Sequence, residues 1–153
     1  MSPIILKRKN KEFLTAWDIL GGKQFMPLPP KSVLEYVKIA NKGIKKRSVI
    51  QLAELMKIPM KDMAVLLNIS YKTLGRKNET DLLDSVSSSI SIEIAETISK
   101  GLAVFEDSDN LSRWLQKGNR ALQGEKPIDL LNTPTGIKMV NRLLVRIEEG
   151  IYT

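Results

Sequence analysis

The chain has 153 residues, of which 42% are hydrophobic and 27% are charged, as expected for a globular protein with its own core. It contains no cysteine and no histidine, which excludes disulfides, thiol nucleophiles, the usual zinc sites and histidine-based acid–base catalysis. We therefore expect a protein that is not an enzyme, with no catalytic residue, no metal site and no cofactor. The longest apolar run, residues 63–67, is too short to span a membrane, and no secretory signal opens the chain, so a cytoplasmic location is expected.

The charge is unevenly distributed along the sequence. The formal net charge is +7; residues 1–80 carry +10 and residues 81–153 carry −3. A basic half favours binding to a polyanion, most simply nucleic acid, because neutralised phosphates release their counterions. The alternative is that the basic half only keeps the protein soluble.

Residues 1–31 are expected to form a basic, poorly structured N-terminal arm. One short amphipathic helix over residues 12–20 is predicted within it, and Gly21 and Gly22 would stop that helix. The proline-rich stretch at 27–30 is typical of an extended linker.

Residues 32–89 are predicted to be a domain of short helices. Ser32 is a suitable cap for a helix that ends at Gly43, and Ser48 followed by Gln51 has the spacing of a capping box for the next helix. The apolar positions of the first of these helices are Val33, Leu34, Val37, Ile39 and Ala40.

The stretch 59–77 has the pattern of a helix-turn-helix. Pro59 suits the start of a first helix with the small Ala64 at its crossing point, Ser70 caps a second helix, and Leu74 anchors it. The outward positions of the second helix can donate to phosphates or base edges and are the predicted DNA-binding residues: Tyr71, Lys72, Thr73, Arg76 and Lys77. The alternative is an ordinary packed helix pair.

A boundary is predicted in the polar, serine-rich stretch 78–89, followed by a second helical domain over residues 90–153. Its expected elements are a helix over about 91–105, a short helix capped by Asp109, a short piece after Pro127, and a long helix that begins at Thr133 and stops at Gly150. No strand pattern occurs, so the predicted fold class is all-α.

Polar side chains of this second domain are candidates for a partner contact. Asn119 and Arg120 lie in the loop after Trp114, and Glu148 and Glu149 end the last helix. Adjacent helix residues diverge by about 100°, so this glutamate pair is read as a solvated face or a partner contact and not as a catalytic dyad.

The spacing of residues in the second domain resembles the toxin-binding domain of the Xre/MbcA/ParS antitoxins. The resemblance covers about residues 94–153, and the preceding helix-turn-helix resembles the Xre-like domain of the same antitoxins. It rests on Trp114, Leu115, Asn119, Leu122, Gly124, Pro127, Leu130, Leu131, Thr133, Gly136, Val140, Leu144, Arg146, Ile147, Gly150 and Ile151.

The resemblance implies the antitoxin of a type II toxin–antitoxin system whose partner is a RES-domain toxin that consumes or transfers from NAD. Such an antitoxin would form a homodimer or higher even-numbered oligomer, bind operator DNA of its own operon through a DNA-binding and dimerisation domain (32–89), and occlude the toxin's active site with its C-terminal region. The expected toxin-binding residues are Asn119, Arg120, Arg146, Glu148, Glu149, Gly150, Ile151 and Tyr152.

Two other classes of function stay open from the residues alone. A free-standing helix-turn-helix transcriptional regulator would explain the basic half but not the patterned C-terminal block. A small hydrolase or transferase is disfavoured by the lack of histidine and cysteine.

Overall fold

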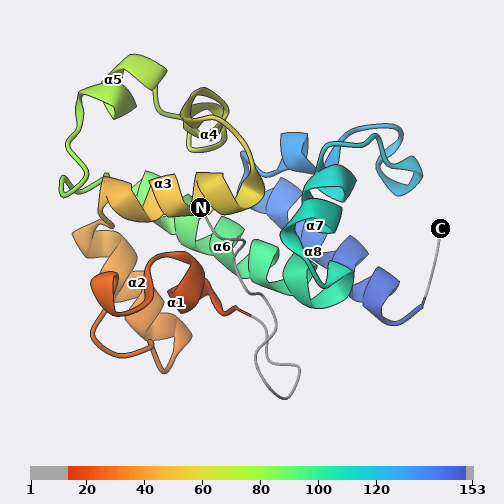
Figure 1. Ribbon diagram of the computed structural model, residues 1–153, viewed down its shortest axis with the longest axis horizontal. Helices are drawn as coiled ribbons and strands as arrows, with labels where there is room; N and C mark the ends of the chain where they lie inside the picture. The colour runs from red at the N-terminus through yellow and green to blue at the C-terminus, as the bar shows by residue number, and fades with distance from the viewer. Residues whose placement is uncertain (1–13, 151–153) are drawn as a thin grey trace.

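The computed structural model describes residues 14–150, and the predicted all-α fold is confirmed (Figure 1). Within these residues the only extended pairing is an isolated bridge between Lys45 and Leu82. No helix in this part of the chain is long and apolar enough to cross a membrane. The elements in chain order are α1 (Ala16–Ile19), η1 (Gly22–Gln24), α2 (Val33–Lys42), α3 (Lys46–Met56), α4 (Met60–Leu66), α5 (Tyr71–Arg76), α6 (Ser85–Phe105), α7 (Ser108–Leu115), η2 (Arg120–Leu122), η3 (Pro127–Leu130) and α8 (Pro134–Glu148), where η marks a 3-10 turn.

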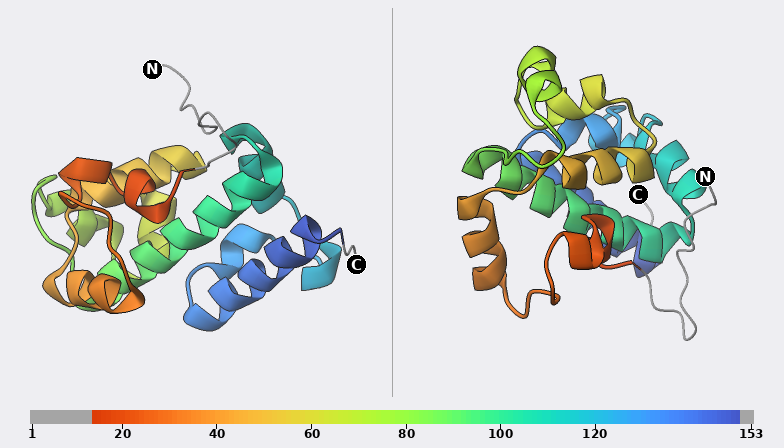
Figure 2. Two further views of the ribbon diagram at one scale, coloured as in Figure 1. Left: turned by 90° about the horizontal axis from the view of Figure 1, so that it is seen from below. Right: turned by 60° about the vertical axis from the view of Figure 1, so that its left-hand side comes forward.

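The long helix α6 is the centre of the molecule. It contacts α1, α2 and α3 from the N-terminal half and α7 and α8 from the C-terminal half (Figure 2). Its side chains Ile94, Ile98 and Leu102 are fully buried in one hydrophobic cluster that includes residues of both halves. A helix surrounded by partners in this way carries apolar residues on most of its circumference.

The linker predicted at residues 78–89 is wrong from Ser85 onward, because α6 runs without a break through the predicted boundary after residue 89. Two of the serines that suggested a linker are buried and hydrogen-bonded: Ser87 Oγ donates to the Asp84 carboxylate at 2.9 Å, and Ser88 Oγ accepts from the Ile44 N–H at 2.9 Å. Hydroxyls satisfied in this way cost little inside a helix.

Asp84 fixes the start of α6 as its N-cap. Its carboxylate accepts hydrogen bonds from the backbone N–H and the hydroxyl of Ser87, at 2.8 and 2.9 Å. Burial acts to raise the pKa of Asp84, but these hydrogen bonds outweigh it and hold the pKa below its usual range.

The described part of the predicted N-terminal arm, residues 14–31, is folded against the core, which corrects the expectation of a poorly structured segment. Thr15 and Asp18 form a capping box for α1, and Leu20 is fully buried. The Trp17 indole N–H donates to the Met26 carbonyl at 3.0 Å and so ties the following loop to α1. The basic cluster of the arm, 7–11, lies outside the described residues.

Helix α2 has the predicted cap at Ser32 and ends at Gly43, and only part of its apolar surface packs on the core. Ala40 is buried, and Tyr36 and Ile39 pack against the core. Burial, together with the nearby carboxylates of α1 and α6, raises the pKa of Tyr36. Three of the apolar positions named from the sequence are exposed: Val33, Leu34 and Val37.

Two predicted helix starts are also corrected. Helix α3 begins at Lys46 and not after Ser48, because the backbone N–H groups of Lys46 and Arg47 donate to carbonyls of the loop 79–81 and need no capping side chain. Helix α7 is capped by Asp107 and not by Asp109, since the Asp107 carboxylate accepts from the Asn110 N–H at 2.7 Å.

Two glycines in helices are expected to respond oppositely to alanine. Gly75 in α5 has open space where a Cβ would stand, so Gly75→Ala should raise the free energy of unfolding by up to about 1 kcal/mol through helix propensity. A Cβ on Gly136 in α8 would collide with the Leu130 carbonyl oxygen, so Gly136→Ala should lower it by about 1–3 kcal/mol. Urea unfolding followed by circular dichroism measures both changes, and a stabilised Gly136→Ala would contradict the packing described here.

Candidate functional site

The first candidate surface is the pair α4 and α5 at one tip of the molecule (Figure 1). The turn between them contains Asn68 in the left-handed region at φ 57°, which asparagine tolerates better than most residues. Ser70 caps α5 by accepting from the Thr73 N–H at 3.0 Å, and Leu74 is buried in the core that α4 shares. The local geometry is therefore a pair of short helices in which α4 packs on the body of the protein and α5 lies on the outside.

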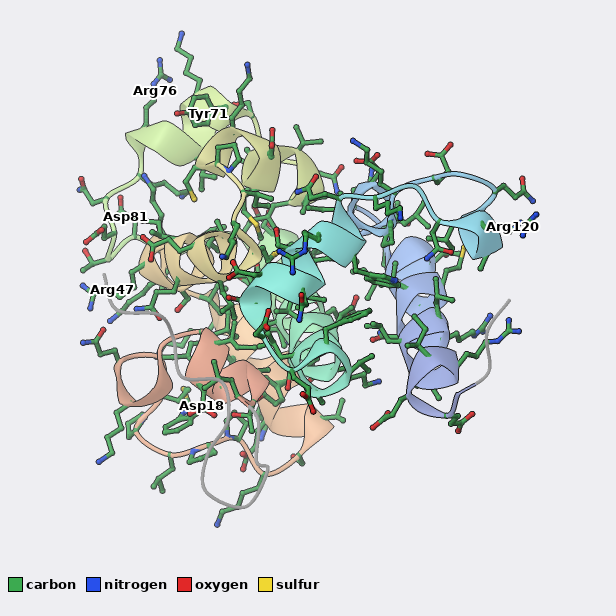
Figure 3. The ribbon with its side chains drawn as sticks, turned by 45° about the vertical axis from the view of Figure 1, so that its right-hand side comes forward. Asp18, Arg47, Tyr71, Arg76, Asp81 and Arg120 are labelled. Atoms are coloured by element: carbon green, nitrogen blue, oxygen red, sulfur yellow. The ribbon has the colours of Figure 1, made fainter. Side chains whose placement is uncertain are left out.

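The five predicted DNA-binding residues divide into two groups. Tyr71, Lys72 and Arg76 are exposed, and Arg76 points away from the body of the protein (Figure 3). Thr73 is engaged in the cap, because its hydroxyl accepts from Ser70 Oγ at 2.7 Å. Lys77 is half-buried, and its ammonium donates to the Leu82 carbonyl at 3.1 Å, so it holds the loop that follows α5.

The start of α3 lies beside this loop and adds cations that sequence reasoning missed. Lys46 Nζ donates to the Lys77 carbonyl at 2.8 Å, and Arg47 and Lys45 flank it on the chain. The sequence signal is the run Lys45-Lys46-Arg47, which contributes to the basic charge of the first half but whose position only the fold determines. The structure brings this run next to the C-terminal end of α5.

The second candidate surface is built by η2, η3 and α8. Asn119 stabilises the η2 turn through two hydrogen bonds. Its side-chain Oδ1 accepts from the Ala121 N–H at 2.9 Å, and the Asn119 backbone N–H donates to the Glu125 carbonyl at 2.9 Å. The turn is tight, since a Cβ on Gly118 would lie 2.7 Å from the Gly124 carbonyl oxygen. Asn119 is thus a positioning residue, while Arg120 beside it is exposed and points outward (Figure 3).

A shallow hollow of about 180 Å³ joins this turn to the outer face of α8. Arg146, a predicted toxin-binding residue, lines it together with residues that sequence reasoning missed: Ala121, Leu122, Met139, Arg142 and Leu143. The signal was present, because positions 139, 142, 143 and 146 follow the i, i+3, i+4, i+7 spacing of one helix face. That face is basic and apolar and differs from the core stripe of α8.

The C-terminal end of α8 carries the acidic candidates. Glu148 is the last helical residue, Glu149 is the C-cap, and Gly150 follows in the left-handed region at φ 77°, as the predicted helix stop requires. All three are exposed. The other two predicted toxin-binding residues, Ile151 and Tyr152, lie outside the described residues.

The two surfaces stand apart, and polar contacts at the surface link the elements between them. Arg76 and Arg120 lie at well-separated edges of the molecule in Figure 3. Between them, Asn68 Nδ2 donates to the Asn132 carbonyl at 3.0 Å, which connects the α4–α5 turn to the residue before the Thr133 cap of α8. An ion pair between Lys57 and Asp109 links the end of α3 to α7. Residues 14–150 contain no cluster of three or more side chains suited to hold a metal.

Comparison with known proteins bears most directly on the C-terminal half. Residues 100–150 match the family described as the antitoxin Xre/MbcA/ParS C-terminal toxin-binding domain. A relative from Sphingobium sp. (strain YBL2), named Prs ADP-ribosylating antitoxin, is 25% identical over 131 residues, which cover 79% of this chain and 82% of the relative. A chain in the crystal structure of the M. tuberculosis MbcT-MbcA toxin-antitoxin complex has a similar fold, with a TM-score of 0.53 and 20% identity over 71% of this chain and 96% of that chain.

Two adjacent residues of the η2 turn are expected to affect stability differently, because one holds the turn and the other is exposed. Asn119→Ala removes the acceptor for the Ala121 N–H and should lower the free energy of unfolding by about 1 kcal/mol. Arg120→Ala removes an exposed side chain and should change it by less than about 0.5 kcal/mol. Urea unfolding measures both, and equal losses for the two variants would show that Asn119 does not hold the turn.

Proposed function

We propose that this chain, an antitoxin of the Xre/MbcA/ParS type, binds a cognate RES-domain toxin that consumes NAD and blocks its active site. It also binds operator DNA of its own operon as a homodimer, in the cytoplasm, and has no catalytic activity of its own. The observation that carries the proposal is the match of residues 100–150 to the toxin-binding domain, on which the exposed face of η2 and α8 lies.

The toxin contact consists of two parts. The hollow lined by Arg142 and Arg146, with Arg120 next to it on the chain, has an apolar floor with cations at its edge, a composition common in interface centres. The second part is the chain end from Glu148 through Tyr152, which leaves the last helix at Gly150. The first part docks the antitoxin and the second enters the toxin's cleft.

The acidic end suits a cleft that binds a dinucleotide. Such a cleft is electropositive where it holds the phosphates, so Glu148 and Glu149 are attracted to the space that the substrate would occupy.

DNA binding is proposed for the outer side of α5. Tyr71, Lys72 and Arg76 are exposed there, and the cations at the start of α3 lie beside it. Arg76 has the donors to read a guanine, and the lysines neutralise phosphates. A homodimer would present two copies of α5 to two half-sites.

Reversal of charge in the hollow should disable the antitoxin. Arg142→Glu combined with Arg146→Glu is expected to weaken binding of the purified toxin by at least about 30-fold, the effect of losing one interface hot spot of about 2 kcal/mol. Calorimetric titration measures the affinity, and growth of cells that co-express the toxin measures protection.

The matched control is Lys100→Glu, which reverses an exposed cation of α6 outside this surface and should leave affinity unchanged. A second arm truncates the chain after Glu149, which keeps all of α8. This truncated chain should still bind the toxin but lose most of its inhibition. If it protects cells as well as the full chain does, the residues after Glu149 do not block the toxin's active site.

Loss of the exposed cations of α5 should weaken DNA binding with a defined salt dependence. Each of Lys72→Ala and Arg76→Ala should reduce the slope of log affinity against log salt by about one if it contacts a phosphate. Fluorescence anisotropy on the DNA upstream of the gene measures this. Lys138→Ala on α8 is the control, and an unchanged slope in both test variants would assign DNA binding to another surface.

A further inference from the structure

A pocket of about 400 Å³ opens where the end of α2 meets the start of α3 (Figure 1). This volume lies within the range of roughly 300–1,000 Å³ that is typical of small-molecule sites. Among the described residues, none of α5 or α8 lines the pocket, so it is separate from both surfaces of the proposed function and does not depend on it. The apolar side chains that line it are Phe25, Met26, Pro27, Ile39, Ile44 and Leu82.

A buried polar group in the wall of this pocket has no partner. Ser48 lines the pocket and is 2% exposed, and its hydroxyl makes no hydrogen bond to any residue of the range 14–150. A serine in a helix often donates to the carbonyl four residues earlier. Here that group is the Ile44 carbonyl, which already accepts from the Leu83 N–H at 2.8 Å. A buried hydroxyl without a partner costs free energy, which a ligand that hydrogen-bonds to it would recover.

Three lysines line the same pocket and give it a positive charge. Lys38 and Lys42 lie one turn apart on α2, and Lys45 is the N-cap of α3. The Ser48 N–H donates to the Lys45 carbonyl at 3.0 Å, which keeps these two residues adjacent. All three lysines are exposed, and within the described part of the chain their ammonium groups form no ion pair and no carboxylate lines the pocket.

We propose that this pocket binds a medium-chain fatty carboxylate. The alkyl chain lies against the apolar wall formed by the loop after η1 and by α2, where it is removed from water. The carboxylate lies between the lysines and α3. There it accepts a hydrogen bond from the Ser48 hydroxyl and pairs with the ammonium groups of Lys42 and Lys45.

The composition of the lining favours this class of ligand over simpler ones. A purely apolar occupant would leave the Ser48 hydroxyl unpaired and would draw the three ammonium groups partly out of water without a counter-charge. A small inorganic anion would satisfy the lysines but leave the apolar wall in contact with water. A carboxylate on an alkyl chain meets both requirements with one molecule.

The two tryptophans allow binding to be measured at the pocket itself. The Trp17 indole N–H donates to the carbonyl of Met26, which lines the pocket, whereas Trp114 lies on α7 and does not line it. In ¹H–¹⁵N spectra of the full chain, octanoate is expected to shift the Trp17 indole signal and leave the Trp114 signal in place. The shift should saturate with a dissociation constant below about 1 mM, as suits a ligand of this size.

Removal of the cations tests the role of the carboxylate. Lys42→Gln combined with Lys45→Gln should raise the dissociation constant of octanoate at least about 10-fold, because the charge-assisted contacts are lost. The matched control is Lys61→Gln combined with Lys117→Gln, which removes two exposed cations outside the pocket and should leave octanoate binding unchanged. For the unaltered chain, 1-octanol and acetate should each bind at least about 10-fold more weakly than octanoate, since each lacks one half of the ligand.

Ser48→Ala tests the unpaired hydroxyl in two ways. The variant should bind octanoate about 5-fold more weakly, because one hydrogen bond to the carboxylate is lost. It should not lower the midpoint of urea unfolding, because the hydroxyl has no partner among residues 14–150 and alanine favours the helix. A lowered midpoint would show that the hydroxyl stabilises the fold, and would count against its role as a ligand contact.

Three results would overturn the proposal. The first is the absence of a shift of the Trp17 signal at about 10 mM octanoate, ten times the expected upper limit of the dissociation constant. The second is equal binding of 1-octanol and octanoate, which would make the pocket an apolar site that needs no anion. The third is unchanged octanoate binding by the variant that lacks Lys42 and Lys45. These titrations contain neither toxin nor DNA, so their failure would leave the proposed function as it stands.

Discussion

Burial of α6 is the constraint on which the rest of the structure depends. The helix contacts helices of both halves, and no single neighbour covers it. Without α6, each half of the chain therefore lacks a complete core. The N-terminal helices and the C-terminal block are both stabilised by packing against this helix. Gly101 shows how close this packing is, since a Cβ there would stand 2.5 Å from Leu111 Cδ1 of α7.

The central helix also separates the surfaces that different partners would use. The cationic tip of α5 and the basic hollow beside Arg146 lie on elements packed against different parts of the core. Their side chains do not share the same space, so the two proposed contacts do not exclude each other. Asn119, Thr133 and Gly136 contribute to this division as structural residues, because they fix the loops that carry the contact residues and need not touch a partner themselves.

The sequence predicted the elements whose signals are local. Ser32, Ser70 and Thr133 cap helices as expected, and Gly43 and Gly150 follow helix ends. The prediction failed where tertiary contacts replaced the local signal. Backbone carbonyls of a distant loop cap α3, and buried hydroxyls inside α6 were mistaken for a linker because their hydrogen-bond partners cannot be read from composition.

The candidate site also shows the difference between what local sequence signals predict and what depends on the tertiary fold. The spacing of the C-terminal block pointed to the same family whose model matches residues 100–150, but the apolar-basic face of α8 was overlooked because Met139 and Arg142 lie off the core stripe of that helix. The apolar positions of α2 were recognised as well, but Val33, Leu34 and Val37 are exposed. Periodicity detects that a helix has apolar residues, but it does not show which of them the tertiary fold will bury.

The unbroken course of α6 also limits how such proteins can exchange parts. A recombination event at residue 89 would cut a helix whose buried side chains contact both halves, so a new N-terminal half would meet a core shaped for the old one. Exchange of the N-terminal half between related chains must therefore carry α6 with it or be followed by compensating changes along its length. In this architecture the two halves of the chain share one core and are inherited as one unit.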